Sequence, residues 1–343
     1  MHKIGLLIIS KNNYDLISHW KNNYNYQNNL ILNLDDGSTS ENKAHGKILC
    51  EELNINFLEA NKPGIQNNII EAANFFEKNG INWILYQHHD SFPLSDNLFD
   101  TLEKITNNKN INNFGVIGFN VLDSINDDLK FWNKHSAPLR TTARSPLELG
   151  DGWYRCRFGS RVNYKYFTKP FAVESVMWSV ALINIDNYKR HIVVDNNFQF
   201  FHAWDDIAFQ FLKKNIFNVV IPYVHFAHDQ AIKQQHKIPF SSANANEKTR
   251  EFFWGHFNHL DVWKKKWLFE YNLSKYLVSN VDISNKKSLK YKFFKYIGCN
   301  HMNFLETVAR KTFKMNINHY KNTLLQDFFY NDPKKGPLTT FDF

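Results

Sequence analysis

The sequence predicts an α/β fold built on a doubly wound, mostly parallel sheet. Short apolar runs that suit strands alternate with segments of helical pattern at close spacing, and this alternation is typical of parallel sheets. The first run, residues 3–9, is almost continuously apolar, as strands are when both faces of the sheet are covered. Polar residues follow several of the runs directly, and this edge of an open α/β sheet is where ligands bind.

Apolar pattern and segment length place the elements along the chain. We expect strands at residues 3–9, 30–34, 55–58, 83–87, 114–119 and 218–224. We expect helices at residues 15–20, 41–53, 66–78 and 97–105, and one more that begins near residues 205–206. Residues 171–185 are an apolar stretch that suits one strand or two short ones.

The chain divides into two parts at about residue 235. Residues 1–235 hold the alternating strands and helices, whereas residues 236–343 are rich in Lys, Phe and Tyr and predict a mainly helical extension. Residues 289–296 alternate basic and aromatic side chains, as segments that bind membrane surfaces do. A helical extension that packs on the first part is the other interpretation, and both can hold together.

Composition excludes a disordered chain and favours an acidic partner. Hydrophobic residues make up 43% and aromatic residues 16% of the 343 residues, which is too apolar for disorder. The net charge of +8 favours nucleotide phosphates, anionic lipid surfaces or nucleic acid. The 3 cysteines are far apart in the sequence, which predicts free thiols and a cytoplasmic location. No run approaches the roughly 18 to 20 apolar residues of a membrane span, so any membrane contact is expected to be peripheral.

Two groups of polar residues stand directly after predicted strands. Asp35 and Asp36 follow the second strand and precede a glycine. They suit a turn, and they also suit hydrogen bonds from a base or a ribose hydroxyl. His88, His89 and Asp90 follow the fourth strand. They are side chains that bind metal ions, although a plain polar turn has a similar composition.

A third polar group stands at the start of the last predicted helix. Asp205 and Asp206 come just before apolar residues at helical spacing. In the first turn of a helix the dipole stabilises negative charge. Helix capping is therefore the ordinary explanation for these two carboxylates.

The order and spacing of four motifs resemble a GT-A glycosyltransferase of the family 2 type. The motifs are Ile-Ile-Ser-Lys-Asn at residues 8–12, Asp-Asp-Gly-Ser-Thr at 35–39, Asn-Lys-Pro-Gly at 61–64 and His-His-Asp at 88–90. The similarity covers roughly residues 1 to 230. The family usually places a carboxylate where His88 stands, as the first member of an Asp-x-Asp motif.

The resemblance implies an inverting transfer of a sugar from a nucleotide-sugar donor to a hydroxyl of a cell-surface glycan or glycolipid, as in polysaccharide biosynthesis. UDP is the expected nucleotide. Asp206 would be the general base that deprotonates the acceptor, and Asp205 would replace the family's preceding glutamate. The donor-binding residues that it implies are Ser10, Asp35, Asp36, either Asn67 or Asn68, His88 and His89, with Asp36 at the base.

The resemblance also implies a divalent cation, Mn²⁺ or Mg²⁺, that neutralises the leaving diphosphate. The expected ligands are Asp90, His88 and His228, with His225 as the alternative to His228. Imidazole ligands favour Mn²⁺ over Mg²⁺. His88 could instead contact the donor directly. We expect strand ends from separate parts of the chain to set Asp36, Asp90 and Asp206 around one cleft.

Residues 121–166 are the expected acceptor zone, because the family has its acceptor site there. This zone interleaves aromatic residues with Arg140, Arg144, Arg155, Arg157 and Arg161. A solvated loop is the other interpretation. Two other functions remain open: a GT-A-like nucleotidyltransferase that releases pyrophosphate, and a non-catalytic protein that binds an anionic ligand or a membrane. Nucleic acid is the less expected partner.

Overall fold

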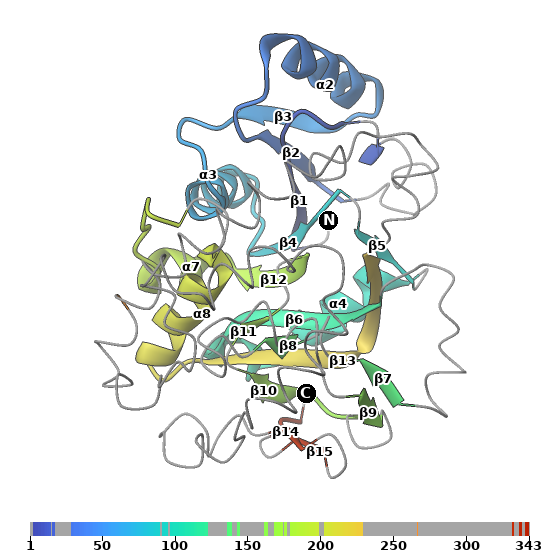
Figure 1. Cartoon of the computed structure of the whole chain (residues 1–343), viewed down its shortest axis with the longest axis vertical. Helices are drawn as coiled ribbons and strands as arrows, with labels where there is room; N and C mark the ends of the chain where they lie inside the picture. The colour runs from blue at the N-terminus through green and yellow to red at the C-terminus, as the bar shows by residue number, and fades with distance from the viewer. Residues whose placement is uncertain are drawn as a thin grey trace, which may run out of the picture.

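The computed structural model describes residues 3–14, 16–17, 29–89, 91–94, 97–122, 136–138, 143–144, 161–163, 168–173, 175–176, 179–198, 202–228, 266, 331–332, 336–337 and 340–342. These residues form a nine-stranded sheet with helices on both faces (Figure 1). The predicted α/β fold class is confirmed.

The central sheet has the strand order β10-β13-β6-β12-β4-β1-β2-β3, and β5 pairs with β13. Its strands are β1 (Ile4–Ser10), β2 (Ile31–Asp35), β3 (Asn56–Glu59), β4 (Trp83–Gln87), β5 (Ser91–Pro93), β6 (Phe114–Leu122), β10 (Phe171–Val173), β12 (Val180–Asn184) and β13 (Phe217–His228). Strands β1, β2, β3, β4, β6 and β13 run in one direction, and β5, β10 and β12 run in the other. The sheet is mostly parallel, as expected, with β12 inserted antiparallel between β4 and β6.

The helices are α2 (Ser40–Glu52), α3 (Ile65–Lys78), α4 (Leu98–Thr106), α7 (Ile185–His191) and α8 (Ala203–Lys213), with a short 3-10 helix η1 (Ile111–Asn113). Helices α2, α3, α4 and α8 fall close to their expected positions, whereas α7 and the short helix η1 were not expected from the sequence. Of the helix expected at residues 15–20, Leu16 and Ile17 are helical and the other positions lie outside the described residues. Three small sheets pair β7 (Ser136–Pro138) with β9 (Arg161–Asn163), β8 (Ala143–Arg144) with β11 (Ser175–Val176), and β14 (Asn331–Asp332) with β15 (Gly336–Pro337).

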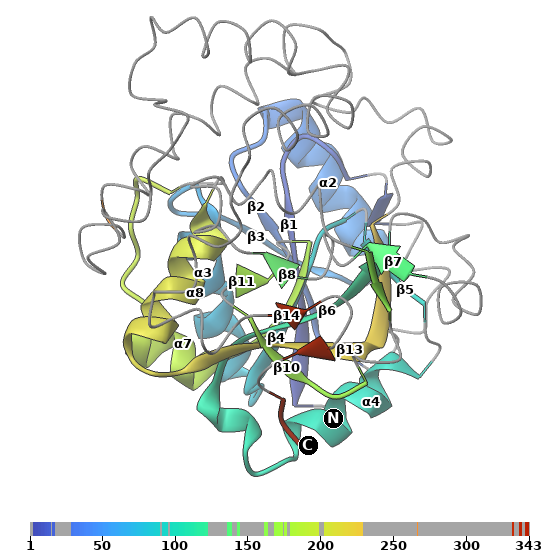
Figure 2. The ribbon, with the colours of Figure 1, turned by 60° about the horizontal axis from the view of Figure 1, so that its bottom comes forward.

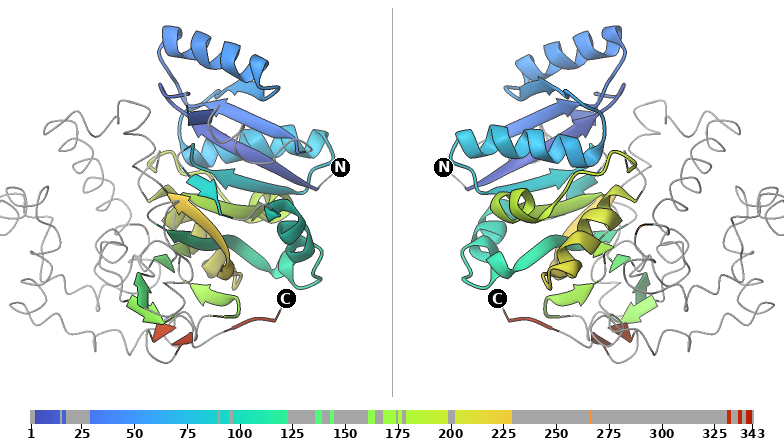
Figure 3. Two further views of the ribbon diagram at one scale, coloured as in Figure 1. Left: turned by 90° about the vertical axis from the view of Figure 1, so that its right-hand side faces the viewer. Right: turned by 90° about the vertical axis from the view of Figure 1, so that its left-hand side faces the viewer.

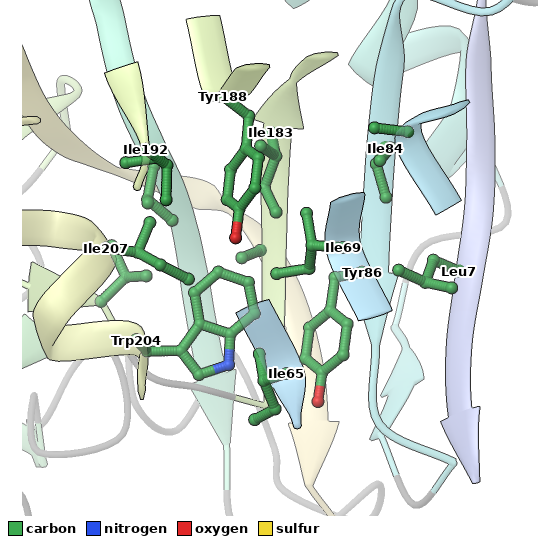
Figure 4. Packing of buried hydrophobic residues seen from close by; sticks show 14 of the residues in the cluster. Leu7, Ile65, Ile69, Ile84, Tyr86, Ile183, Tyr188, Ile192, Trp204 and Ile207 are labelled. Atoms are coloured by element: carbon green, nitrogen blue, oxygen red, sulfur yellow. The ribbon is translucent and has the colours of Figure 1, made fainter. Parts of the chain in front are cut away.

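Helices α3, α7 and α8 lie together on one face of the sheet (Figures 2 and 3). Their apolar side chains interlock with those of β4, β1 and β12, and Figure 4 shows Tyr188, Ile69, Trp204 and Tyr86 in this layer. The Trp204 and Tyr86 ring centroids are 5.0 Å apart. Truncating a buried tryptophan typically costs about 3–5 kcal/mol, so this contact fixes the start of α8 against β4.

The opposite face is covered by α2 and α4. Leu102 and Ile105 of α4 and Cys50 of α2 are buried in a second apolar layer. Because both faces are covered, the central strands are apolar on both sides. Among the described residues, no helix has the length and hydropathy needed to cross a bilayer.

The last residues of the chain return to the edge of the sheet. Thr340 pairs with Phe171 of β10, and the Phe341 ring centroid lies 4.7 Å from that of Phe114 and 5.7 Å from that of Phe217. Of the predicted extension, residues 236–343, the structure describes only residue 266, in a helix, and the short stretches near the C-terminus. The expected domain boundary and the helices of the extension lie outside the described residues.

Candidate active site

The carboxyl ends of β1, β2 and β4 meet at one edge because these strands are parallel neighbours. Ser10 is in register with Asp35, and Ile8 is in register with Gln87. The Ser10 hydroxyl is buried and donates to Asn33 Oδ1 at 2.7 Å. The Ser10 hydroxyl proton is therefore used inside the sheet, and the donor-binding role of Ser10 stays a prediction.

Asp35 shapes the loop that follows β2. Its carboxylate is buried, and Oδ1 accepts a hydrogen bond from the Ser38 backbone N–H at 2.9 Å. The Tyr14 hydroxyl lies 3.2 Å from Ser38 Oγ. Burial raises the pKa of Tyr14, so its hydroxyl stays protonated. Asp35 therefore stabilises the turn after β2 through its side chain, as expected of an aspartate at a strand end.

Asp36 is half-buried and connects the β2 loop to α3. Its Oδ1 accepts from the Gly64 backbone N–H at 2.7 Å and from Asn68 Nδ2 at 2.8 Å. Gly64 has a φ of 109°, which a side chain would disfavour. Within the part of the chain that the structure describes, no group donates to Oδ2 of Asp36. That oxygen is suited to a ligand N–H or hydroxyl.

Asn68, rather than Asn67, lies beside Asp36. Asn68 is buried, whereas Asn67 turns the other way and donates to Pro63 O and Asn196 Oδ1, both at 3.0 Å. Neighbouring helix positions point about 100° apart. The structure thus places Asn68, and not Asn67, against Asp36, and the donor-binding role of either residue stays a prediction.

His88 and His89 stand at the end of β4. Their rings are stacked with centroids 5.9 Å apart. The His88 backbone N–H donates to Ser179 O at 2.8 Å, and His89 Nε2 lies 3.5 Å from Asn13 Nδ2 in the loop after β1. Both side chains are half-buried at the edge where Asp36 lies. The next predicted ligand, Asp90, lies outside the described residues.

The predicted metal ligands are only partly within the described residues. In the sheet register His228 pairs with Ser91, the residue after Asp90. This pairing brings the His228 backbone beside the β4–β5 connection. The alternative, His225, lies 2.9 Å from Asn120 Nδ2 through Nδ1, and burial lowers its pKa. Among the described residues there is no group of three or more His, Cys, Asp or Glu side chains that could hold a metal ion.

Asp205 secures the start of α8. Its Oδ1 accepts from Ser175 Oγ at 2.8 Å, and its Oδ2 lies 2.9 Å from His202 Nδ1. His202 precedes the helix with a left-handed φ of 57°. All three side chains are buried. Asp205 therefore links α8 to β11, a contact that the sequence did not indicate.

Asp206 is fully buried and accepts hydrogen bonds on both oxygens. Oδ2 accepts from Gln66 Nε2 at 2.9 Å and from Gln210 Nε2 at 2.8 Å. Oδ1 pairs with Lys266 Nζ at 2.7 Å. Burial raises the pKa of Asp206, and Lys266 opposes this rise without cancelling it.

Asp206 belongs to a hydrogen-bonded ring of four residues, with Lys266, Asp195 and Gln66. Lys266 also pairs with Asp195 Oδ2 at 2.9 Å, and the Asp195 backbone N–H donates to Gln66 Oε1 at 2.7 Å. Burial raises the pKa of Asp195, but its bonds to Lys266 and to Asn197 outweigh burial and lower it. This ring joins α3, α8 and residue 266 to Asp195, which lies in the turn before α8.

The start of α3 connects Asp36, a predicted donor-binding residue, to Asp206, the predicted base. Gly64 and Asn68 bind Asp36, while Gln66 binds Asp206. Sequence reasoning missed Gln66 and Lys266. A glutamine on the buried side of a helix is a weak signal in the sequence, and a lysine within the run 264–266 has the pattern of a solvated charge.

No family model and no curated protein matches the chain. Among solved structures, the crystal structure of GalNAc-T7 with UDP, GalNAc and Mn²⁺ aligns with a TM-score of 0.45 and 13% identity, over 92% of this chain and 58% of that one. The mannosyltransferase PcManGT from Pyrobaculum calidifontis in complex with GDP-Man and Mn²⁺ aligns with a TM-score of 0.45 and 10% identity, over 93% of this chain and 84% of that one. This chain thus spans less than two thirds of the first of these proteins.

Proposed function

We propose that this protein is an inverting glycosyltransferase that transfers a sugar from a nucleotide-sugar donor, with UDP as the expected nucleotide, to a hydroxyl of a glycan or glycolipid. The observation that carries the proposal is the first turn of α3, which binds Asp36 on one side and Asp206 on the other. One short segment thereby connects a candidate donor site to a candidate base.

The donor side is built at the edge formed by β1, β2 and β4. Among the described residues, both hydrogen bonds to the Asp36 carboxylate fall on Oδ1, which leaves Oδ2 for an N–H of the base. His88 and His89 stand at the end of β4, near the loop that follows β1. This arrangement suits a nucleotide that lies across the carboxyl ends of the strands.

The proposed site for the divalent cation is at the same edge. His88 follows β4, and the His228 backbone lies opposite Ser91, so Asp90, His88 and His228 are the residues that would hold Mn²⁺ or Mg²⁺. A bound cation would neutralise the charge that develops on the leaving diphosphate. Two imidazoles and one carboxylate favour Mn²⁺.

Asp206 is the proposed general base. Burial raises its pKa, which makes the carboxylate a stronger base than one in water. In a single displacement, the acceptor oxygen gives its proton to Asp206 as it bonds to the anomeric carbon. The bond from that carbon to the diphosphate breaks at the same time, and the configuration inverts.

A donor screen tests the proposal. The full chain is incubated with Mn²⁺ and a panel of UDP, GDP and other nucleotide sugars, and release of nucleoside diphosphate and the melting temperature are measured. We expect UDP-sugars to raise the melting temperature and to yield UDP, and we expect Asp206→Asn to prevent transfer while the protein still binds UDP. Release of pyrophosphate from a nucleoside triphosphate, or an absence of any nucleotide effect, would contradict the proposal.

The acceptor and the location belong to the same proposal. Residues 289–296 carry the basic and aromatic side chains expected of a segment that contacts the inner face of a membrane. A cytoplasmic enzyme held there would meet lipid-linked acceptors. Sedimentation with vesicles that contain anionic lipid tests this, and binding to neutral vesicles alone would count against it.

A further inference from the structure

The last residues of the chain bind the edge of the central sheet at β10, which stands at the end of the strand order. Phe171 of β10 pairs with Val220 of β13 on one side and with Thr340 on the other, antiparallel in both cases. The Phe341 backbone N–H also donates to Pro170 O at 2.8 Å. The C-terminal residues therefore extend the sheet in the way that a bound peptide adds a strand to an open edge.

The Phe341 ring packs against side chains from the starts of two other strands. Its centroid lies 4.7 Å from that of Phe114, the first residue of β6, and 5.7 Å from that of Phe217, the first residue of β13. Ala172 and Leu212 belong to the same apolar cluster. Tilted and edge-to-face ring pairs at these distances are favourable. The surroundings of residue 341 thus favour an aromatic side chain there.

An exposed ion pair adds to the same contact. Asp342 Oδ1 lies 2.7 Å from Lys169 Nζ, and these side chains are 86% and 58% exposed. An exposed pair contributes little affinity, but its charges favour one register of the segment. Phe341 is itself half-buried. Contacts of this kind, made by consecutive residues at the end of the chain, suit a segment that docks on a folded domain.

We propose that the edge of β10 is a docking site for an extended segment with an aromatic residue followed by an acidic one, and that residues 340–342 of this chain are its occupant. The site lies at the amino ends of β6 and β13, whereas the candidate active site lies at the carboxyl ends of the parallel strands. Because β13 ends at His228 and the chain returns at Thr340, docking fixes both ends of residues 229–339. This tether does not depend on the proposed transfer reaction.

Peptide binding to the full chain tests the docking site. The probe is a fluorescein-labelled peptide of residues 336–343, and the receptor is the full chain with Phe341→Ala, which weakens its own segment. Fluorescence polarisation should show saturable binding to this receptor and at least tenfold weaker binding to wild type, whose tethered segment competes. A peptide that itself carries Phe341→Ala should bind at least tenfold more weakly than the wild-type peptide. Equal binding of the two peptides would overturn the inference.

Charge reversal tests the register of the bound segment. Lys169→Glu in the same receptor should weaken binding of the wild-type peptide about threefold, and a peptide with Asp342→Lys should bind this receptor more tightly than the wild-type peptide does. Lys189→Glu is the matched control, because Lys189 pairs with Glu77 at 2.6 Å on the surface, and it should change neither affinity. A Lys169→Glu receptor that still prefers the wild-type peptide would count against this register and so against the proposed site.

A cleavable chain keeps the test decisive where Phe341→Ala does not fold. The full chain with a protease site after residue 338 is folded first and then cut. The fragment 339–343 should leave on dilution, the domain should stay folded, and labelled peptide should take the place of the fragment. Unfolding of the domain on cutting would show that the segment is part of the core, and the inference would be wrong. Dimers of the cut chain that excess peptide does not dissociate would also contradict it, because the edge would then prefer a second copy.

Discussion

Gln66 Nε2 lies 2.9 Å from Asp206 Oδ2, a contact between residues 140 positions apart in the chain. The same side chain accepts from the Asp195 backbone N–H at 2.7 Å. One glutamine thus connects α3 to both the turn before α8 and the first turn of α8. The position of the candidate base therefore depends on a helix from the first half of the protein.

Replacing this glutamine should destabilise the fold. We expect Gln66→Leu to lower the free energy of unfolding by about 2–3 kcal/mol, because the buried Asp206 carboxylate and the part-buried Asp195 backbone N–H both lose a partner. Urea unfolding measures this. Asn67→Ala, which removes only exposed contacts, should cost less than about 1 kcal/mol. Equal losses for the two variants would contradict the buried network.

Nucleotide binding should depend on Asp36 and Asn68 but not on Asn67. Asp36→Ala and Asn68→Ala should each weaken UDP binding about tenfold, a change of roughly 1.4 kcal/mol. For Asn68 the reason is that its amide orients Asp36. Calorimetric titration with UDP and Mn²⁺ measures the affinity, and melting curves check that each variant is folded. A larger effect from Asn67→Ala would place the nucleotide on the other side of α3.

Substitutions of Asp205 and Asp206 should have different effects on rate and stability. Asp206→Asn should lower kcat by about 10²–10⁴ because the general base is lost, with the melting temperature reduced but a folded protein retained. Asp205→Asn should mainly reduce stability, since both Asp205 oxygens hold the start of α8 through Ser175 and His202. Comparing rates per folded molecule separates the two effects. The opposite ranking would identify Asp205 as the base.

The rate of transfer should fall on the acidic side at a pH above that of an ordinary aspartate. Burial raises the pKa of Asp206, so protonation removes the base at a pH above about 3.9, the usual value. The raised pKa of Asp206 affects stability in the opposite direction to activity. The protonated carboxyl stabilises the folded state at low pH, and this stabilisation is lost as pH rises through the pKa of the folded state. Profiles of kcat/KM and of melting temperature against pH measure both effects. A wild-type rate that stays constant down to pH 4 would be inconsistent with this base.

Removal of divalent cations should stop the reaction. A chelator should reduce turnover by at least tenfold, and Mn²⁺ should restore it better than Mg²⁺ because imidazoles are among the expected ligands. Asp90→Asn should weaken the response to Mn²⁺. Full activity in the chelator would count against His88, Asp90 and His228 as a metal site.

The aromatic side chain of Phe341 should stabilise the domain. Phe341 is half-buried against Phe114 and Phe217, so Phe341→Ala should cost about 1–3 kcal/mol. The adjacent Asp342→Asn removes an exposed pair with Lys169 and should cost less than about 1 kcal/mol. Urea unfolding of the two variants provides the comparison, and equal effects would contradict the packing.

The sequence by itself determined the fold class, most strand and helix positions, and the residues that stand at strand ends. It could do so because burial on both faces makes a strand such as residues 83–87 continuously apolar, and because polar residues such as Asp36 and His88 follow directly in the chain. These signals are local.

Only the tertiary structure decided that β12 runs antiparallel between β4 and β6, that Asn68 rather than Asn67 binds Asp36, and that Asp205 is enclosed by Ser175 and His202. It also placed Gln66 and Lys266 on Asp206. These contacts join residues that are distant in the chain or separated by a single helical step. Neither apolar periodicity nor motif spacing encodes them, because both describe neighbours along the backbone, whereas a buried charge takes its partners from whatever elements pack around it.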